Sequence, residues 1–411
     1  MNLKKYFLTN DITIINITFF FVGFSLPFSL AFNSICLILF IAFSFFYFDK
    51  KNIKELINFK EIYFYFIIFY LIQILSYFYS ANKNIALENL SRNVLFFILP
   101  ITFLNIKHKL NNRSFKYLFT GLILSIILSI LKVYSSLILT LPFFQIKDFL
   151  RERFVEKGIY NIHVPYFSML ILLVLIFTVK SNFLKNKKYN KIIKLILFFL
   201  LLISLFFLSG LMSFLILIFY IYSFFFKSKI KKTKKIAITF FFLLISISSL
   251  YLIKNLDKAE REKGAENLIF RIYSLANSKN NSTVRFQNWK SVVEVISENI
   301  FLGIGVDGGI NKLLEHREPL NEPFVNKHNA HNVYLETLLR YGIIGFLPFS
   351  IILLLLIKKA FLTKNYFFIW FLIVFLISSL TESFLQRQIG IVTFCFFSLF
   401  FYTKNNLSLT S

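Results

Sequence analysis

Apolar runs of about membrane-spanning length recur along the whole chain, and they constrain its fold more than any other feature. Of the 411 residues, 57% are hydrophobic, which is more apolar surface than a soluble core of this length can bury. A run of about 20 apolar residues crosses a bilayer as a helix. Because lipid cannot satisfy backbone polar groups, only helices and closed barrels span membranes, and these runs lack the alternation of barrel strands. The sequence therefore predicts an all-α, polytopic integral membrane protein.

The lengths of the runs predict about twelve transmembrane helices within one integral-membrane domain, residues 1–411. One run, 195–226, is too long for a single crossing, and Ser209-Gly210 is the expected break within it. A short polar loop is expected at 80–92, and a much larger loop at 254–340. The first helix is expected at about residues 12–30, and the second returns from there to about residue 48. The others are expected at about 62–79, 94–106, 118–139, 164–179, two within 195–226, 236–253, 343–357, 366–380 and 389–402. The first run has no small-residue cleavage site, so it is expected to remain as the first membrane helix.

The positive charge of the chain follows the pattern of a membrane topology. A net charge of +26 would indicate nucleic acid in a soluble protein, but most Lys residues here lie in short loops, where they set orientation. We therefore expect a lipid bilayer and no nucleic acid as partner. With the N-terminus inside, most short-loop Lys and Arg residues lie inside, so both termini are expected to be cytoplasmic and loop 254–340 periplasmic. This orientation depends on the break at Gly210, because a single helix over 195–226 would invert everything after it.

The Cys and His residues do not indicate a metal site. Cys36 and Cys395 both lie in apolar runs, so no disulfide framework is expected. His328 and His331 form an H-x-x-H pair, but a metal needs three or four converging ligands. We expect no bound metal and no cofactor.

The polar stretch 281–345 contains the residues best suited to chemistry. Apolar residues follow Arg285 at helical spacing, namely Trp289, Val292, Val293 and Ile296. The pattern predicts an amphipathic helix and leaves two interpretations open. The helix could lie on the membrane surface with a snorkelling Arg, or the guanidinium could bind a phosphate or pyrophosphate.

Three glycines within this stretch, Gly303, Gly305 and Gly308, spell G-x-G-x-x-G. That motif indicates dinucleotide binding only between a strand and a helix, with an acidic residue about 20 positions further on. The expected periplasmic location is also away from cytosolic nucleotides. We interpret the glycines as a tight turn that lets the loop fold back.

His331 begins a second helical pattern, in which Asn332 and Glu336 share one face and Gly342 is a natural terminator. His331 is therefore expected at or near a helix N-terminus, where the dipole disfavours imidazolium. A neutral imidazole beside an anion site can act as a general base. The alternative is a solvated or capping His.

Several short motifs occur in an order that resembles the O-antigen ligase superfamily. This superfamily includes O-antigen ligases, related O-antigen polymerases and bacterial protein O-oligosaccharyltransferases. The motifs are Arg285 with Trp289, Asn299 through Gly303 to Gly305, His331-Asn332 with Leu335-Glu336, and Tyr341-Gly342 with Gly345 before a membrane helix. Segment 162–166, with His163 before Pro165, resembles the family's His-Pro segment, and Thr381-Glu382-Ser383 with Arg387, Gln388 and Gly390 resembles its closing segment.

The resemblance implies a metal-independent transfer of a glycan from an undecaprenyl-pyrophosphate carrier at the periplasmic face of the bacterial inner membrane. By position, His331 matches the residue that activates the acceptor hydroxyl, and Arg285 matches an Arg that holds the donor pyrophosphate. Trp289, Asn332, Glu336 and His163 are expected to support the site. Many members carry a second Arg where this chain reads LSGLMS, 208–213. Either another cation replaces it, namely Arg151 and Arg153 with Arg92 and Arg387 as further candidates, or the donor is bound differently.

The acceptor stays open among lipid A-core, a growing glycan chain and a protein hydroxyl, which correspond to a ligase, a polymerase and an oligosaccharyltransferase. A different class, a transporter or flippase of polyprenyl-linked glycans, also fits twelve helices. Such a protein is expected to have two similar halves and polar residues near the midplane. The halves here differ, and Lys132 is the main charge within a helix. A non-catalytic scaffold with a long outer loop is a third possibility.

Overall fold

The computed structural model describes residues 11–50, 52–140, 163–181, 187–208, 211–227, 284–317 and 329–404. Within these ranges the chain is helical and has no strand, which confirms the all-α prediction. The chain divides into two compact units, one formed by 1–129 together with 284–411 and the other by 130–283. Most of the residues singled out from the sequence lie in the first unit.

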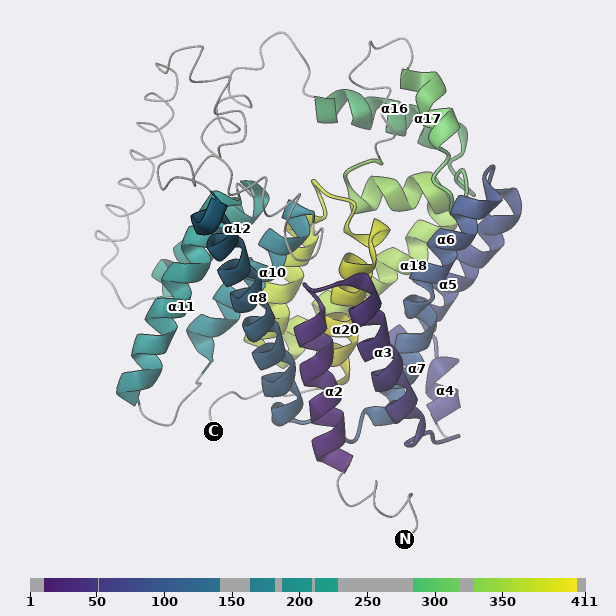
Figure 1. Ribbon diagram of the computed structural model, residues 1–411. Helices are drawn as coiled ribbons and strands as arrows, with labels where there is room; N and C mark the ends of the chain where they lie inside the picture. Colours follow the sequence, from purple (N-terminus) through teal and green to yellow (C-terminus); the bar gives the residue numbers. More distant parts are fainter. Residues whose placement is uncertain are drawn as a thin grey trace, which may run out of the picture. The chain divides into compact units, whose positions relative to one another are not determined.

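The helices of the first unit come from both ends of the chain (Figure 1). They are α2 (Asp11–Ser25), α3 (Leu30–Phe45), α4 (Asn52–Leu56), α5 (Ile62–Tyr79), α6 (Lys83–Asn93), α7 (Leu95–Ile106), the first part of α8 (Asn112–Thr140), α16 (Val284–Glu298), α17 (Ile310–Arg317), α18 (Val333–Thr363), α19 (Tyr366–Ser378), the 3₁₀ helix η4 (Phe384–Gln386) and α20 (Gln388–Thr403). The second unit contains the end of α8 with α10 (Val164–Lys180), α11 (Lys187–Phe207) and α12 (Leu211–Lys227).

An aromatic cluster around α20 forms the core of the first unit. Residues of α20 are buried on every side from Ile389 to Phe401, which is typical of a central helix. Phe396 of α20 meets Phe19 of α2, Phe40 of α3 and Phe103 of α7, with ring centroids 5.3, 5.1 and 5.0 Å away. Edge-on and tilted contacts of this kind are favourable for aromatic rings. Helix α20, the last helix that the structure describes, therefore holds three early helices together.

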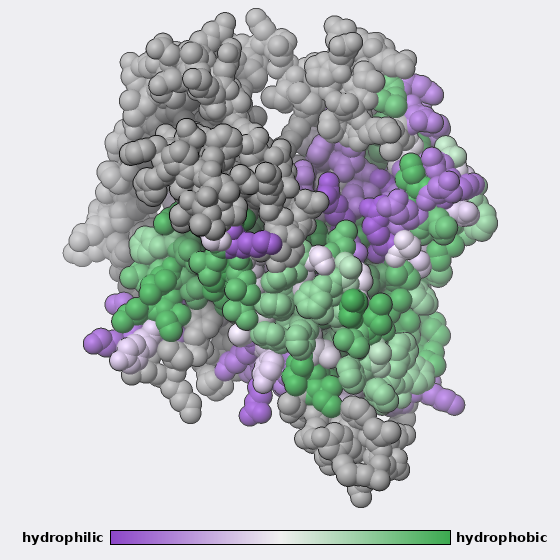
Figure 2. Space-filling view, viewed as in Figure 1, coloured by the Kyte–Doolittle hydropathy of each residue, from purple (hydrophilic) through white to green (hydrophobic). Residues whose placement is uncertain are grey.

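Several helices of the described chain are suited to a bilayer. Three apolar stretches are long enough to cross it, namely Lys83–Ile106, Asn112–Ser135 and Val333–Thr363, and seven shorter apolar helices accompany them. On the face seen in Figure 2, hydrophilic residues of the first unit gather where α6, α16 and α17 lie, and hydrophobic residues cover the helices below. These features are those of a membrane protein. The count of twelve crossings and the periplasmic side of loop 254–340 stay predictions.

Helix boundaries agree with the sequence where an apolar run is bounded by polar residues. Helix α5 covers the predicted 62–79, and α10 begins at the predicted Val164. Separate helices, α11 and α12, lie on either side of the predicted break at Ser209-Gly210. The helix expected at 236–253 lies outside the described residues.

One predicted loop assignment was wrong. Residues 80–92 do not form a loop, because α6 occupies most of this segment. Its N-cap is Asn82, whose Oδ1 accepts from the backbone N–H of Ile85 at 3.1 Å, a favoured way to start a helix. The segment is polar enough to resemble a loop, yet it buries one apolar face. Within 254–340 the two predicted helical patterns are present, as α16 and the first turns of α18, together with the short helix α17.

A break at Gly342 divides α18 into two parts. Gly342 has φ 57° and ψ −163°, and a Cβ there would lie 2.1 Å from the carbonyl oxygen of Phe301. Four backbone hydrogen bonds join the break to the turn 300–305. They run from Ile304 to Leu339, Gly305 to Arg340, Ile343 to Ile300 and Ile344 to Phe301. The part after the break, 343–363, spans roughly 30 Å at the helical rise, which suits a bilayer core. The part before it carries the candidate site.

Candidate active site

His331 lies in a tightly fixed turn immediately before α18. Its φ is 46°, a left-handed conformation that costs a non-glycine residue about 1–2 kcal/mol. The turn is held because the His331 N–H donates to Asn329 Oδ1 at 3.1 Å, and Asn332 caps the helix by accepting from the N–H groups of Tyr334 and Leu335. Strain maintained in this way marks candidate functional residues. The expected position of His331 next to a helix N-terminus is thus confirmed.

The imidazole of His331 is paired with a carboxylate from a distant segment. Its Nδ1 lies 3.2 and 3.1 Å from the two carboxylate oxygens of Glu382. The Glu382 side chain is 6% exposed, whereas that of His331 is 27% exposed. A buried carboxylate therefore fixes one ring nitrogen, while the imidazole as a whole stays partly accessible.

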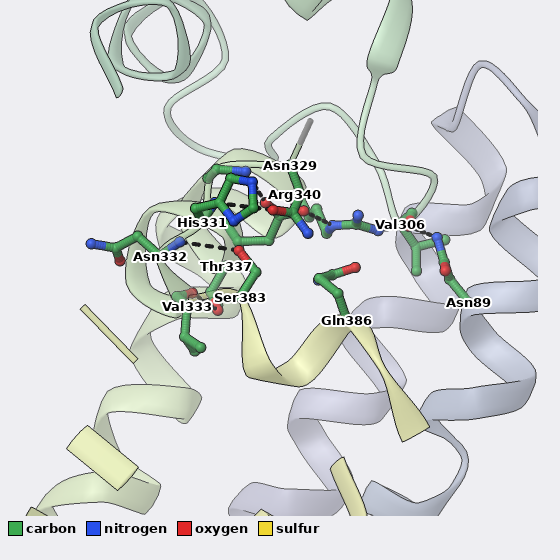
Figure 3. A network of polar contacts seen from close by, with 12 residues as sticks. Asn89, Val306, Asn329, His331, Asn332, Val333, Thr337, Arg340, Ser383 and Gln386 are labelled. Carbon is green, nitrogen blue, oxygen red and sulfur yellow. Dashed lines mark hydrogen bonds and ion pairs between the residues drawn. The ribbon is translucent and has the colours of Figure 1, made fainter. Parts of the chain in front are cut away.

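Further hydrogen bonds attach this turn to the segment between α19 and η4. The Asn332 N–H donates to Ser383 Oγ at 3.1 Å, and its Nδ2 donates to the carbonyl of Leu380 at 3.1 Å. The Val333 N–H donates to the carbonyl of Ser379 at 2.9 Å. Figure 3 shows His331 and Asn332 beside Ser383, with Gln386 of η4 below them. The relative position of His331 and Glu382 is therefore set by the backbone on both sides.

This pairing has a direct chemical consequence. When the proton of a neutral imidazole is on Nδ1, that nitrogen donates to the carboxylate and the basic lone pair lies on Nε2. A carboxylate in this position also stabilises the imidazolium that forms when Nε2 accepts a proton. The arrangement is that of a general base with an orienting acid residue.

A buried ion pair lies next to the His331 turn. Arg340 Nε donates to Glu336 Oε1 at 2.6 Å, and the two side chains are 8% and 3% exposed. The other carboxylate oxygen, Oε2, accepts from the Ala330 N–H at 2.7 Å. Arg340 Nη1 donates to the carbonyl of Val306, which also accepts from Asn89 at 2.9 Å, as Figure 3 shows. Glu336, predicted to support the site, thus connects the residue before His331 to the turn that follows α16.

Helix α16 packs over this network. Trp289 Nε1 donates to the carbonyl of Ala330 at 2.8 Å, and Asn288 Nδ2 donates to that of Asn329 at 2.9 Å. Its apolar face is buried against α17, α18 and the turns beside them, in a cluster made of Val292, Val295, Ile304, Leu313, Ala330 and Leu339. The apolar face of the described part of α16 is therefore covered by other parts of the protein. Trp289 thus contacts the residue that precedes His331.

Two details of the sequence interpretation are resolved by this packing. Val293, predicted on the apolar stripe, is 51% exposed, and Val295 is buried in its place. The stripe is shifted because α16 packs on two helices, which widens its buried face. Gly303, Gly305 and Gly308 have positive φ angles of 68°, 102° and 84°, and they form the predicted turn that folds the chain back on α18.

The other predicted site residues are described only in part. Arg285 lies in the first turn of α16, one helical turn before Trp289, and its side chain is outside the described residues. Arg151 and Arg153 lie outside them altogether. His163 belongs to the second unit, where it is half-buried at the N-cap position of α10. The structure therefore brings together His331, Asn332, Glu336 and Trp289.

Two further cations considered from the sequence lie near the Glu382 segment. Arg92 of α6 donates to the carbonyl of Gln386 at 3.1 Å and pairs with Glu88 at 2.8 Å. Arg387 is the N-cap residue of α20. Both flank η4, which follows Ser383 directly.

Sequence reasoning assigned no role to Glu382 or Arg340. Arg340 had a local signal, because it follows Glu336 by four residues on a predicted helix. Glu382 was part of a recognised motif, but nothing local pairs it with His331, 51 residues earlier.

Metal ligands do not converge in the described part of the chain, where no group of three His, Cys, Asp or Glu side chains could hold an ion. His316 pairs instead with Glu298 at 3.2 Å and Glu294 at 3.8 Å. His328 of the H-x-x-H pair lies outside the described residues.

Apolar helices and a carboxylate-supported imidazole at the start of α18 together define a membrane protein with an enzyme-like site. Residues 193–350 match the model of a family described as O-antigen ligase. This match, over 158 of the 411 residues, supports the resemblance to the O-antigen ligase superfamily that the motifs indicated. No curated protein matches the chain closely enough to count as a relative.

The family match sets the general function. It implies a glycosyltransferase-like enzyme of O-antigen ligase or polymerase type, acting in surface polysaccharide biosynthesis. Such proteins act on lipid-linked glycans, and the apolar helices agree with a location in the bacterial inner membrane. The matched range includes Arg285 and His331 but ends before Glu382.

Proposed function

We propose that this protein transfers a glycan from an undecaprenyl-pyrophosphate carrier to an acceptor hydroxyl, with lipid A-core as the acceptor. The observation that carries the proposal is the contact between His331 Nδ1 and the buried Glu382 carboxylate, at 3.1 Å to the nearer oxygen. It gives the site a supported base next to α18, and the family match supplies the reaction class. An O-antigen polymerase or a protein O-oligosaccharyltransferase would use the same step with a different acceptor.

The proposed step is a single displacement at the anomeric carbon of the donor. Nε2 of His331 takes the proton of the acceptor hydroxyl as its oxygen forms a bond to that carbon. The bond between the anomeric carbon and the pyrophosphate oxygen breaks, and the pyrophosphate leaves with the electron pair. The positive charge gained by the imidazole is stabilised by Glu382. The donor is already activated, so the step is proposed to need no nucleotide and no metal.

The leaving pyrophosphate requires cations, and Arg285 is the first proposed. It lies in the first turn of α16, whose Trp289 is bound to the residue before His331. Guanidinium groups bind phosphate oxygens in pairs, and helix N-termini favour anions. Arg151 and Arg153 are proposed as the second cation, with Arg92 and Arg387 as candidates beside the Glu382 segment.

A transporter of polyprenyl-linked glycans explains the site less well. Transporters place their polar residues near the bilayer midplane. His331, Glu336 and Arg340 all precede the break at Gly342, and the apolar part of α18 follows it. A site at the end of a spanning helix suits transfer at the membrane surface.

We expect the site to face the periplasm, with both termini in the cytoplasm. An alkaline phosphatase reporter fused after Lys290 should be active, and one fused after Lys232 should be inactive, because phosphatase matures only outside the cytoplasm. A green fluorescent protein reporter at the same positions should give the opposite result and serves as the control. An inverted pattern would mean that 195–226 crosses the membrane once, and the proposed orientation would be wrong.

The proposed reaction is tested with purified full-length protein, undecaprenyl-pyrophosphate oligosaccharide and lipid A-core, with product followed by gel mobility. We expect transfer, also in excess chelator. Arg285→Lys should lower the rate at least tenfold, because Lys keeps the charge but loses the paired donors. Lys290→Ala, on the exposed side of the same helix, is the matched control and should retain activity. Failure to consume the donor with lipid A-core, glycan or peptide acceptors would refute the proposal.

A further inference from the structure

A large hollow in the first unit lies apart from the residues of the proposed chemical step. Its volume is about 830 Å³, within the range of small-molecule sites. One wall is the end of α5 and the start of α6, and the other is the chain from the end of α16 to the start of α17. The space is large enough for a sizeable polar ligand, and none of its lining residues has a role in the step proposed above.

The charges of the lining do not suit a pyrophosphate. Its charged residues in the described chain are Glu298, Asp307 and Lys312, so carboxylates outnumber ammonium groups. Pyrophosphate sites are rich in Arg, Lys and exposed backbone N–H groups. Lys312 is also engaged, because its Nζ donates to Asn299 Oδ1 at 3.3 Å. The hollow is therefore unsuited to the donor's leaving group.

The polar groups of the lining suit a neutral, hydroxyl-rich ligand instead. Asn82, Asn299 and Asn311 line the hollow, and each amide offers both donors and acceptors. Asp307 is 4% exposed; one of its oxygens accepts from the Asn82 N–H at 3.0 Å, and the other has no hydrogen-bond partner within the described residues. Tyr79 adds an aromatic ring with a polar tip. Carbohydrate hydroxyls both donate and accept, which is what this mixture of amides and carboxylates requires.

One edge of the hollow is apolar and exposed. Phe301 and Leu302 line it and are 68% and 54% exposed, and Phe78, one residue before the lining Tyr79, is 71% exposed. The Tyr79 hydroxyl fixes this edge by donating to the carbonyl of Leu302 at 2.6 Å. In a membrane protein such an exposed group of large apolar side chains is suited to lipid chains. A ligand at this edge can keep its lipid part in the bilayer while its polar part enters the hollow.

The wall of the hollow is connected to the proposed base. The turn 303–309 forms part of that wall. Arg340 binds its Val306 carbonyl and also pairs with Glu336, which accepts from the N–H group next to His331. A ligand bound against this turn would thus contact a segment whose position relative to His331 is fixed by these bonds.

We propose that this hollow binds the glycan of a membrane-anchored glycolipid, the acceptor substrate, whose lipid lies against Phe301 and Leu302. The proposal rests on the proposed transferase function and names where that enzyme holds its acceptor. The donor pyrophosphate binds elsewhere, at the cations described above.

The test uses full-length protein in nanodiscs and rough lipopolysaccharide, which is lipid A-core without O-chain, as the probe. Asn311→Trp places a large side chain in the hollow from an exposed position on α17, and Ile85→Trp does so from the wall formed by α6. Both should raise the Kd for the probe at least tenfold. Glu315→Trp, exposed on α17 but outside the lining, is the matched control and should bind as the unchanged protein does. Free core oligosaccharide should compete with the probe, whereas lipid A without core should not.

Transfer assays test whether filling the hollow weakens binding of the acceptor and not of the donor. Asn311→Trp should raise the KM for lipid A-core at least tenfold and leave the KM for the undecaprenyl-pyrophosphate donor within twofold. Unchanged probe binding by both hollow-filling variants, a loss of donor affinity instead, or competition by lipid A alone would each overturn the proposal. If the unchanged protein transfers nothing but binds the probe in the hollow, the transferase function fails while the glycolipid site stands.

Discussion

Replacing His331 with Gln is expected to reduce glycan transfer by roughly 10²–10⁴-fold, the usual contribution of a positioned general base. The amide of Gln can still donate to Glu382, so the turn before α18 should keep its contacts. It cannot accept the acceptor's proton in the way a basic imidazole nitrogen does. The rate of transfer by purified protein, at saturating donor and acceptor, measures the loss.

His316 provides a matched control for this replacement. Its side chain is 27% exposed, as is that of His331, and it is also paired with carboxylates, those of Glu294 and Glu298. His316→Gln removes the same functional group from a similar electrostatic environment outside the candidate site. We expect its transfer rate to stay within twofold of that of the unchanged protein. Equal losses in the two variants, or full activity of His331→Gln, would contradict the role of His331 as the base.

Replacing Glu382 with Gln distinguishes the contribution of the base from that of the residue that orients it. The amide oxygen can accept from Nδ1, so the geometry is kept and only the charge is lost. We expect a smaller reduction than for His331→Gln, and no additional loss when both replacements are combined, because residues that act as a unit are not additive. Fully multiplicative losses would show that Glu382 acts apart from His331.

The structure was predictable from the sequence wherever one local pattern dominated. The apolar run that became α5 is bounded by Glu61 and Ser80, and its limits followed from hydropathy alone. The break at Gly342 was also evident, because it depends on the conformational preference of one residue type. His331 could therefore be placed next to a helix N-terminus before any coordinates.

The features that could not be predicted from the sequence depend on tertiary packing. Residues 80–92 read as a polar loop, but Ala86 and Leu90 are buried and hold them in a helix. The pairing of His331 with Glu382 joins positions 51 residues apart, and no periodicity reports such a contact. The hollow beside Asp307 is lined by segments more than 200 positions apart, as the bond between Asp307 and the N–H of Asn82 illustrates. Only the fold places such residues together.

The second large effect is expected at the buried pair of Glu336 and Arg340. Arg340→Met leaves the Glu336 carboxylate buried without its partner, and the loss of one member of a buried pair costs about 3–5 kcal/mol. It also removes the bond to the carbonyl of Val306. We expect a clear fall in the apparent Tm of the detergent-purified protein. Lys358→Met removes a charge from an exposed position on the same helix and should leave the Tm unchanged.

A double replacement distinguishes stability from positioning at this pair. In Glu336→Met/Arg340→Met no charge is left buried, so much of the lost Tm should return, because buried ion pairs are often replaced by apolar residues at little cost. Transfer should not return, since the N–H group of Ala330 loses its acceptor on Glu336 and the turn that holds His331 loses a fixed contact. Recovery of both Tm and transfer would mean that the pair only stabilises the fold. Recovery of Tm alone would show that this ion pair holds the base in position.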